Sequence, residues 1–263
     1  MKVIDFHTHL PLKQNSAEQA FTAYRKELDR SGTEKAVLLP LVRDRIGNKS
    51  IAQACRRDPR IIAFAALDPR SSSAVGELKR AVEKYGLQGV KLHPRLENFS
   101  VLSKPVLKVV QAAGRLGVPV LVCAFPDSAL LSRGNTPVSF GALAEHCPET
   151  QIVLAHAGGH YVMDVLMMIK KHKNLHMDIS FSLSYYAGSS VPQDIVYAVK
   201  SLRGERVFYG SDFPERGMEE AIGLARRLFE ENNVEKETQQ MVFFKNASYF
   251  LSKGRRLRWM PEV

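Results

Sequence analysis

Residues 61–67, IIAFAAL, and residues 118–122, VPVLV, are near-continuous runs of apolar side chains. Such runs are typical of strands that are buried on both faces, as in a parallel sheet covered by helices. Stretches with apolar residues at helical spacing lie between the strand-like runs, for example at 218, 221, 222, 225, 228 and 229. The two runs therefore indicate an α/β fold built from strand–helix units.

The same pattern recurs along the whole chain. Eight short β-rich runs are each followed by a helical stretch: Val3–Phe6, Ala36–Pro40, Ile61–Leu67, Gly89–His93, Val118–Ala124, Ile152–His156, Leu175–Ser180 and Arg206–Ser211. Eight such units in 263 residues match a closed (β/α)8 TIM barrel in size and count. An open doubly wound sheet is the alternative. No linker divides the chain, so we expect a single domain over residues 1–263 with a basic tail at about 253–263.

Composition and charge narrow the class of protein. The chain is 45% hydrophobic and 24% charged, and 37 basic against 27 acidic residues give a net charge of +10. Apart from residues 203–206 and the tail, the basic residues lie beside acids and accompany no nucleic-acid-binding motif, so we predict no nucleic-acid partner. No apolar run approaches the ~18 residues of a membrane helix, and the first ten residues are too short and polar for a signal peptide. Three cysteines without a close pair favour reduced thiols, and we expect a cytoplasmic location with no membrane partner.

Side chains capable of chemistry lie at the C-terminal ends of the predicted strands. His7 and His9 end the first strand, and a strand's period of two points both imidazoles to one face, where they could hold one metal ion. Further candidates end or follow other strands: Lys91, His93, His156 and Asp212. Barrel enzymes carry their active sites at this end. We therefore predict an active site there.

Four motifs occur in register along the chain: IDFHTH at 4–9, GVKLHP at 89–94, IVLAHAGG at 152–159 and YGSDFP at 209–214. Together with FKNASYFL at 244–251, they resemble the amidohydrolase superfamily. Within it they resemble the amidohydrolase-2, or decarboxylase-like, branch of TIM-barrel metal-dependent hydrolases. The resemblance extends from Val3 to about Leu251 and so covers nearly the whole chain.

The resemblance implies a mononuclear site for a divalent metal ion, with zinc as the expected ion. Its ligands would be His7, His9, His156 and Asp212, with His156 in some members stabilising the substrate oxyanion instead. Imidazole nitrogens and a carboxylate suit zinc with an open position for water. Asp212 would act as general base, and His156 is the second catalytic candidate. The alternatives are a helix N-cap for Asp212 and a buried, hydrogen-bonded histidine for His156.

One position departs from the pattern of the branch. Many members end the fifth strand with a His-Thr-Gly-like sequence whose histidine completes the metal site, whereas this chain has Cys123 there. A thiolate can ligate zinc, but an isolated buried cysteine more often behaves as a small hydrophobe, which is our expectation. Some lactonases that resemble this branch work without metal, so the metal dependence stays open.

We predict that Lys91, His93 and Arg95 bind the substrate. If the loops after strands 4 and 5 fold over the site, Arg95, Lys91 and Arg133 would make the barrel mouth electropositive, which favours a small carboxylated molecule. The alternative is that these arginines lie on surface loops. In binuclear relatives a strand 4 lysine is carboxylated, but GVKLHP is usual in branch members with no binuclear site. We therefore expect Lys91 to act as a positive charge, with an ion pair inside the barrel as the alternative.

The leading functional prediction is a hydrolase that acts on a small carboxylated molecule through metal-activated water. The alternatives are a non-oxidative decarboxylase or a metal-free lactonase on the same site, and a catalytically inactive barrel that binds a ligand. The expected partner is the small-molecule substrate, and a homo-oligomer is left open.

Overall fold

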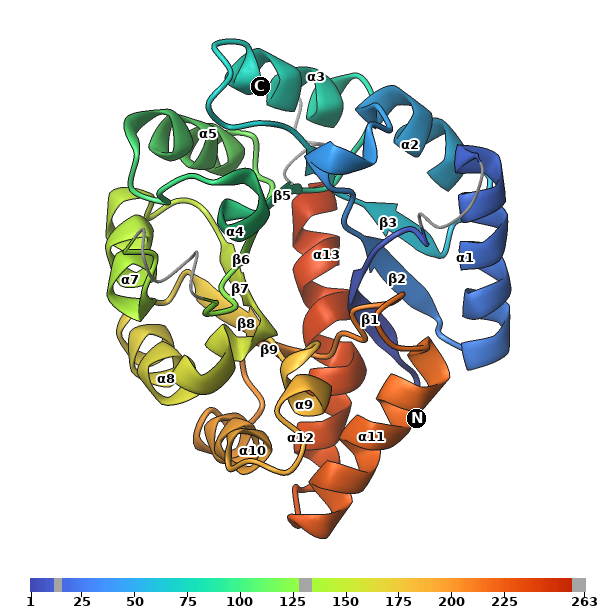
Figure 1. Cartoon of the computed structure of the whole chain (residues 1–263), viewed down its shortest axis with the longest axis vertical. Helices are drawn as coiled ribbons and strands as arrows, with labels where there is room; N and C mark the ends of the chain where they lie inside the picture. Colours follow the sequence, from blue (N-terminus) through green and yellow to red (C-terminus); the bar gives the residue numbers. More distant parts are fainter. Residues whose placement is uncertain (12–15, 128–133, 257–263) are drawn as a thin grey trace.

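The computed structural model of the chain describes residues 1–11, 16–127 and 134–256. Arg133 and residues 257–263 of the predicted basic tail lie outside this part. The chain folds as a TIM barrel in one unit, with parallel strands at the centre and helices around them (Figure 1). Within the described residues, no helix is long and apolar enough to span a membrane.

The strands pair in parallel, each with the next along the chain, apart from the break between β3 and β4. They are β1 (Ile4–Thr8), β2 (Lys35–Leu38), β3 (Ile61–Ala63), β4 (Ala65–Ala66), β5 (Val90–Leu92), β6 (Val120–Cys123), β7 (Ile152–Ala155), β8 (Leu175–Asp178) and β9 (Val207–Phe208). The predicted run Ile61–Leu67 is split at Phe64. There the Phe64 N–H still donates to Leu38 O of β2, while the Ala65 N–H donates to Gly89 O beside β5, so this segment connects the two sheet sections.

Backbone contacts also join the first strand to the last. The Phe6 N–H donates to Tyr209 O at 2.8 Å, and Thr8 forms a parallel bridge with Phe213. These contacts continue the parallel pairing from β9 back to β1. They place the ends of both strands side by side.

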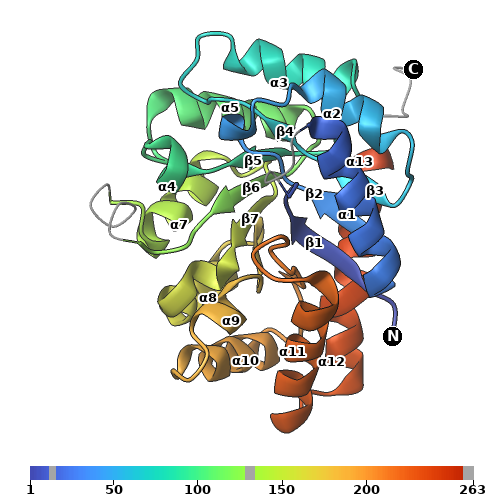
Figure 2. The same ribbon diagram turned by 45° about the vertical axis from the view of Figure 1, so that its right-hand side comes forward.

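Apart from α13 (Asn246–Arg256), eight helices of eight or more residues in the described part of the chain surround the strands: α1 (Ala17–Ser31), α2 (Asn48–Cys55), α3 (Ala74–Glu83), α5 (Lys104–Arg115), α7 (Pro137–His146), α8 (Val162–Lys171), α10 (Val191–Ser201) and α11 (Met218–Glu231). Short helices follow the strands at the face seen in Figure 1: η1 (Val42–Asp44), α4 (Pro94–Glu97), η2 (His156–Tyr161) and α9 (Ser182–Tyr185). The chain ends in α12 (Lys236–Gln240), η3 (Met241–Lys245) and α13 (Asn246–Arg256). In Figure 2, α4 lies on one side of the strands and α13 on the other.

The barrel interior is apolar towards α13. Phe6 and Phe208 stack there with ring centroids 4.3 Å apart, and Ala247 and Leu251 of α13 belong to the same buried cluster. α13 therefore covers the N-terminal end of the barrel. The polar side chains of the interior lie at the opposite end, where the C-terminal ends of the strands meet.

An irregularity in β1 sets the direction of its histidines. Asp5 pairs with Ala36 and Thr8 with Leu38, so three steps along β1 oppose two along β2. Strict alternation would turn His7 away from the interior that holds Phe6. A bulge resets the alternation. Both Phe6 and His7 therefore face inward.

Candidate active site

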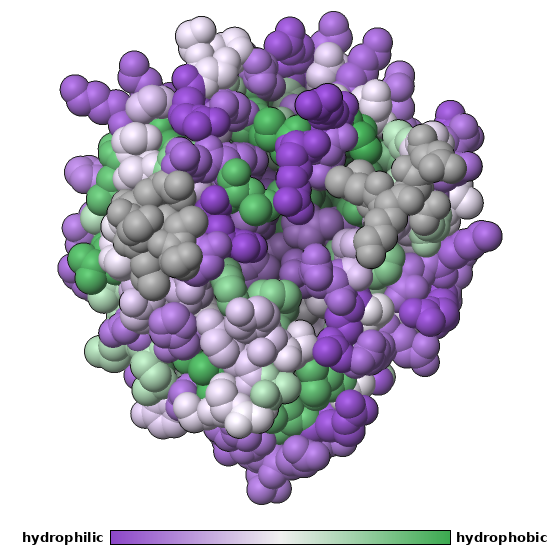
Figure 3. Space-filling view, in the orientation of Figure 1, coloured by the Kyte–Doolittle hydropathy of each residue, from purple (hydrophilic) through white to green (hydrophobic). Residues whose placement is uncertain are grey.

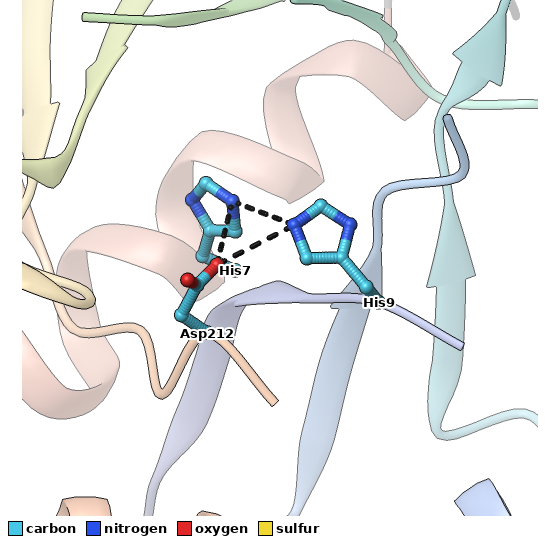
Figure 4. Close-up of side chains that lie close together, drawn as sticks. All are labelled: His7, His9 and Asp212. Atoms are coloured by element: carbon cyan, nitrogen blue, oxygen red, sulfur yellow. Dashed lines mark hydrogen bonds and ion pairs between the residues drawn. The ribbon is translucent and has the colours of Figure 1, made fainter. Parts of the chain in front are cut away.

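Three predicted metal ligands meet at the C-terminal end of the barrel. His7 Nε2 and His9 Nε2 lie 3.3 Å apart, and each lies 3.4 Å from Asp212 Oδ1 (Figure 4). The same face of the molecule has a central hollow in which hydrophilic side chains gather (Figure 3). His7 and Asp212 are buried and His9 is partly exposed, so the group is within reach of a small molecule.

The protonation of the two imidazoles can be read from their other nitrogens. His7 Nδ1 lies 2.9 Å from Asp178 Oδ2, and His9 Nδ1 lies 2.6 Å from Leu39 O. Both of these oxygens are acceptors, so each ring carries its proton on Nδ1 and turns the bare Nε2 towards Asp212. Burial, together with the neighbouring Lys91, lowers the pKa of His7 to about 3, which keeps this ring neutral.

The donor set fits a divalent cation. Two imidazole lone pairs and a carboxylate oxygen face one another, and Asp212 Oδ1 is buried with no well-formed hydrogen bond within the described residues. Such an arrangement of acceptors is unfavourable without a cation. Tetrahedral zinc ligands at about 2.0–2.1 Å from the ion lie roughly 3.3–3.4 Å from one another. The three separations match this spacing.

Backbone contacts hold Asp212 in place. Its N–H donates to His7 O at 2.9 Å, and Asp5 Oδ1 accepts from both the His7 and Ser211 N–H groups. Asp212 has a φ of 60°, an uncommon conformation for a residue with a side chain and one that recurs at functional sites. α11 begins only at Met218, so the N-cap alternative for Asp212 is wrong.

Asp178, at the end of β8, is a site residue that the sequence analysis missed. Its Oδ2 accepts from His7 Nδ1, and its Oδ1 accepts from the Ser180 hydroxyl, the Ser180 N–H and the His156 N–H. Burial alone would raise its pKa, but His7 and then His156 and Ser180 hold the pKa below its usual range. A polar residue ending the buried run LHMD was the available signal.

His156 lies beside the three-residue group, at the end of β7. Its ring centroid is 4.7 Å from that of His7, and its Nδ1 lies 2.9 Å from Ser180 Oγ. It shares a second set of close ligand atoms with His7 and Asp178, but it does not join His7, His9 and Asp212 in theirs. A metal-ligating role for His156 therefore stays a prediction.

The three predicted substrate residues lie on or just after β5. Lys91 is 2% exposed and its Nζ lies 3.3 Å from His7 Nε2, so this amine faces the metal ligands. His93 caps α4 by accepting the Leu96 N–H on its Nδ1. The half-buried Arg95 is the outermost of the three.

Arg95 borders a group of aromatic rings at the mouth. Its guanidinium carbon lies 5.6 Å from the centroid of Phe125. Phe125, Phe181 and Tyr185 lie with all three pairs of centroids 5.0 Å apart, and Phe181 reaches to 5.6 Å from the His156 ring. We call Phe125, Phe181 and Tyr185 the aromatic wall. A cation and flat apolar surfaces therefore border the catalytic candidates.

Cys123 differs from the expected small hydrophobe. It is fully buried at the end of β6, yet it belongs to neither apolar cluster of the described residues. Its electrostatic neighbours are His93, Arg95 and His156, which come from the segments after β5 and β7 on either side of β6. Burial alone would raise the pKa of the thiol, but the adjacent His93 and His156 hold this pKa well below its usual range. The sequence analysis did not anticipate these polar neighbours.

The sequence matches the model of the amidohydrolase family over residues 4–252. The chain belongs to the amidohydrolase family. No curated protein matches it with significant sequence similarity. The family is one of amidohydrolases, and the solved structures with a similar fold include a probable hydrolase and a decarboxylase.

Three solved structures are similar to this amidohydrolase. An uncharacterized TIM-barrel protein from Bordetella bronchiseptica has a TM-score of 0.77 at 15% identity, with 97% of this chain and 100% of that chain covered. A probable 2-pyrone-4,6-dicarboxylic acid hydrolase from Acinetobacter baumannii, with citric acid bound, has a TM-score of 0.69 at 18% identity, with 96% of this chain and 100% of that chain covered. A 2,6-dihydroxybenzoate decarboxylase complexed with 2,6-dihydroxybenzoate has a TM-score of 0.69 at 15% identity, with 96% of this chain and 99% of that chain covered. At these identities the likeness concerns the fold.

Proposed function

We propose that this amidohydrolase is a metal-dependent hydrolase of a small, planar, carboxylated molecule. The observation that carries the proposal is the convergence of His7 Nε2, His9 Nε2 and Asp212 Oδ1 at 3.3–3.4 Å. Three facing acceptors that are positioned by backbone and buried partners make a preorganised cation site. Zinc is the proposed ion because the donors are two neutral imidazoles and one carboxylate.

A divalent ion held by these residues would supply Lewis acidity and lower the pKa of water to near neutrality. Asp212 is the proton carrier: its carboxylate adjoins His7 and His9 and takes the proton as the nucleophile forms, then returns it to the leaving group. His156 lies against His7 and would donate to the developing oxyanion.

The substrate class follows from the mouth of the barrel. Arg95 presents a guanidinium that can pair with a carboxylate, and Phe125 lies beneath it. The aromatic wall continues this surface to His156 and suits a flat, conjugated molecule. Lys91, which is almost fully buried, would bring a second positive charge close to the reacting group.

Non-oxidative decarboxylation of an aromatic carboxylate is the second candidate. The observation that favours it is the 5.6 Å separation between the rings of His156 and Phe181, which puts a proton donor beside the stacking surface. A ring stacked there could receive a proton from His156 as carbon dioxide leaves. The similar 2,6-dihydroxybenzoate decarboxylase makes this chemistry a natural comparison.

One experiment separates the two candidates. The zinc-loaded protein is incubated in ¹⁸O-labelled water with a panel of planar lactones and aromatic carboxylates, and products are analysed by mass spectrometry. Hydrolysis predicts a carboxylate product that contains one ¹⁸O atom, whereas decarboxylation predicts released carbon dioxide and a product shorter by one carbon. Turnover that persists unchanged after complete chelation would contradict the metal-dependent proposal.

A further inference from the structure

Asp5 is a fully buried residue of β1 that the proposed reaction does not use. Its neighbours Ile4 and Phe6 belong to the apolar cluster inside the barrel, so alternation along the strand turns the Asp5 side chain to the opposite face. Within the described residues, Asp5 belongs to neither group of close metal-ligand atoms. Burial of a carboxyl group is costly unless it forms hydrogen bonds, so its partners indicate what it does.

One oxygen of Asp5 forms both of its hydrogen bonds to the backbone. Asp5 Oδ1 accepts from the His7 N–H at 3.2 Å and from the Ser211 N–H at 2.9 Å. Asp5 Oδ2 is buried and has no well-formed hydrogen bond in the part of the chain that the structure describes. The side chain therefore acts as a single acceptor that β1 shares with the segment after β9.

The first of these hydrogen bonds lies at the bulge in β1. Between Asp5 and Thr8, three steps along β1 oppose two along β2. The His7 N–H, which a regular ladder would direct to a neighbouring strand, donates to Asp5 Oδ1 instead. Because this bulge turns His7 inward, an acceptor for the His7 N–H stabilises the direction of a proposed metal ligand.

The second hydrogen bond holds the segment that carries Asp212. Ser211 immediately precedes Asp212, and the Asp212 N–H donates to His7 O at 2.9 Å. The φ of 60° at Asp212 belongs to a conformation that persists only where the surrounding structure holds it. Asp5 Oδ1 thus binds the backbone beside both side chains whose ligand atoms, His7 Nε2 and Asp212 Oδ1, lie 3.4 Å apart.

We propose that Asp5 is a positioning residue, whose Oδ1 sets the spacing of the His7 and Asp212 ligand atoms by holding the backbone next to each. This inference rests on the proposed function, in which these two side chains share one ion with His9. Without Asp5 Oδ1, two buried N–H groups lose their acceptor, one in His7 itself and one adjacent to Asp212. A metal ion would then have to order both ligands as it binds, which weakens the binding.

The test uses the full-length protein, first metal-free and then titrated with zinc. In the metal-free protein, Asp5→Ala should increase the amide hydrogen-exchange rates of His7, Ser211 and Asp212 relative to the rest of the barrel, because the first two lose their acceptor and the third is held through them. The zinc affinity of Asp5→Ala should fall about tenfold, at the lower end of the effect of residues that support metal ligands.

Two further variants separate the hydrogen bonds from a general effect on packing. Asp5→Asn keeps the size of the side chain and the Oδ1 acceptor, so the three exchange rates and the zinc affinity should stay close to those of the wild type. Asp5→Ser ends one bond shorter, and its hydroxyl can accept from the N–H two residues further on but does not extend to Ser211. It should therefore protect the His7 amide and leave the Ser211 amide exchanging as fast as in Asp5→Ala.

Thr150→Val controls for the loss of a buried hydrogen bond elsewhere. Thr150 is 1% exposed, and its Oγ1 donates to Val110 O at 2.9 Å. It lies just before β7, at the N-terminal end of the barrel. This variant should lower the free energy of unfolding but leave the zinc affinity and the exchange of the His7 and Ser211 amides as they are in the wild type.

The outcomes distinguish the role of Asp5 from the proposed function. Wild-type exchange rates and zinc affinity in Asp5→Ala would overturn the proposal, and so would an Asp5→Asn variant that is as impaired as Asp5→Ala. If Asp5→Ala folds poorly, a Ser211 amide that stays protected in Asp5→Ser would overturn it. A wild-type protein that binds no zinc would contradict the proposed function, while amide exchange would still decide whether Asp5 holds the two segments.

Discussion

His7 and Asp178 form a fully buried pair, with His7 Nδ1 2.9 Å from Asp178 Oδ2. The pair joins β1 to β8 across the barrel interior, and it fixes the tautomer that turns His7 Nε2 towards Asp212. Because Asp178 also holds the backbone N–H of His156, one carboxylate positions a proposed metal ligand and a proposed catalytic residue.

Asp178→Asn tests this positioning role. The amide keeps the size of the side chain but removes the charge that orients His7. Loss of the hydrogen-bond partner of a metal-ligating histidine commonly lowers the metal affinity 10–100-fold. We expect zinc affinity to fall by roughly that factor. Competition with a chromophoric chelator measures it. The exposed Asp164→Asn on α8 is the matched control and should bind zinc as the wild type does; equal affinities for the two variants would refute the role of Asp178.

Asp212→Asn should separate catalysis from stability. General base catalysis is commonly worth about 10²–10⁴ in rate, so turnover should fall by at least that range. The metal-free protein should unfold at the same or a higher temperature, because the Asn amide can donate to the bare Nε2 atoms of His7 and His9, a gain of roughly 1 kcal/mol. Chelator-treated samples in a thermal scan give the stability. Near-normal turnover would refute the proton-carrier role.

His176 predicts a pH dependence of stability that is unrelated to the active site. Burial, with a smaller effect from Arg206, lowers the pKa of His176 to about 3. In the unfolded chain, His176 binds a proton below about pH 6.5, whereas in the folded protein it stays neutral down to about pH 3. The free energy of unfolding therefore decreases as the pH falls from about 6.5 to about 3. The expected loss between pH 7 and pH 5 is about 2 kcal/mol.

Chemical denaturation at the two pH values measures this loss. His176→Phe places an apolar ring beside Phe208 and Phe250 and should remove the part of the dependence on pH that His176 contributes, about 2 kcal/mol between pH 7 and pH 5. The control is His146→Gln at an exposed position, whose free energy of unfolding should change with pH as it does in the wild type. If His176→Phe loses as much stability as the wild type between pH 7 and pH 5, the assignment to His176 is wrong.

Much of the barrel could be predicted from local sequence signals. Apolar runs such as VPVLV indicate buried strands. The TIM-barrel fold places the polar side chains that can act in catalysis at the C-terminal ends of these strands. The split at Phe64 could not be predicted, because a change of hydrogen-bonding partner within IIAFAAL depends on the neighbouring strands. The bulge in β1 likewise arises from pairing with β2, and no turn residue signals it.

The site was predictable where a residue ends a strand in a recognisable motif, as His7 and His9 do. Asp178 was missed because an isolated aspartate in LHMD has no motif around it. Its partners His7 and His156 lie 171 and 22 residues away along the chain, and only Ser180 is local. The N-cap reading of Asp212 followed from the local pattern SDFPE, but the helix begins later, at Met218. Cys123 resembled a core residue because its polar neighbours come from other strands.

The zinc stoichiometry and affinity of the wild-type protein and of His9→Ala test the central claim most directly. His9 is partly exposed, so its removal should leave the barrel folded, and the exposed His160→Ala at the same end serves as the control. The account predicts one zinc ion per chain in the wild type and in His160→Ala, and an affinity at least about 100-fold lower in His9→Ala, because a direct ligand contributes more than its supporting partners. A folded wild-type protein that binds no stoichiometric zinc, or a His9→Ala variant that binds it equally well, would contradict the account.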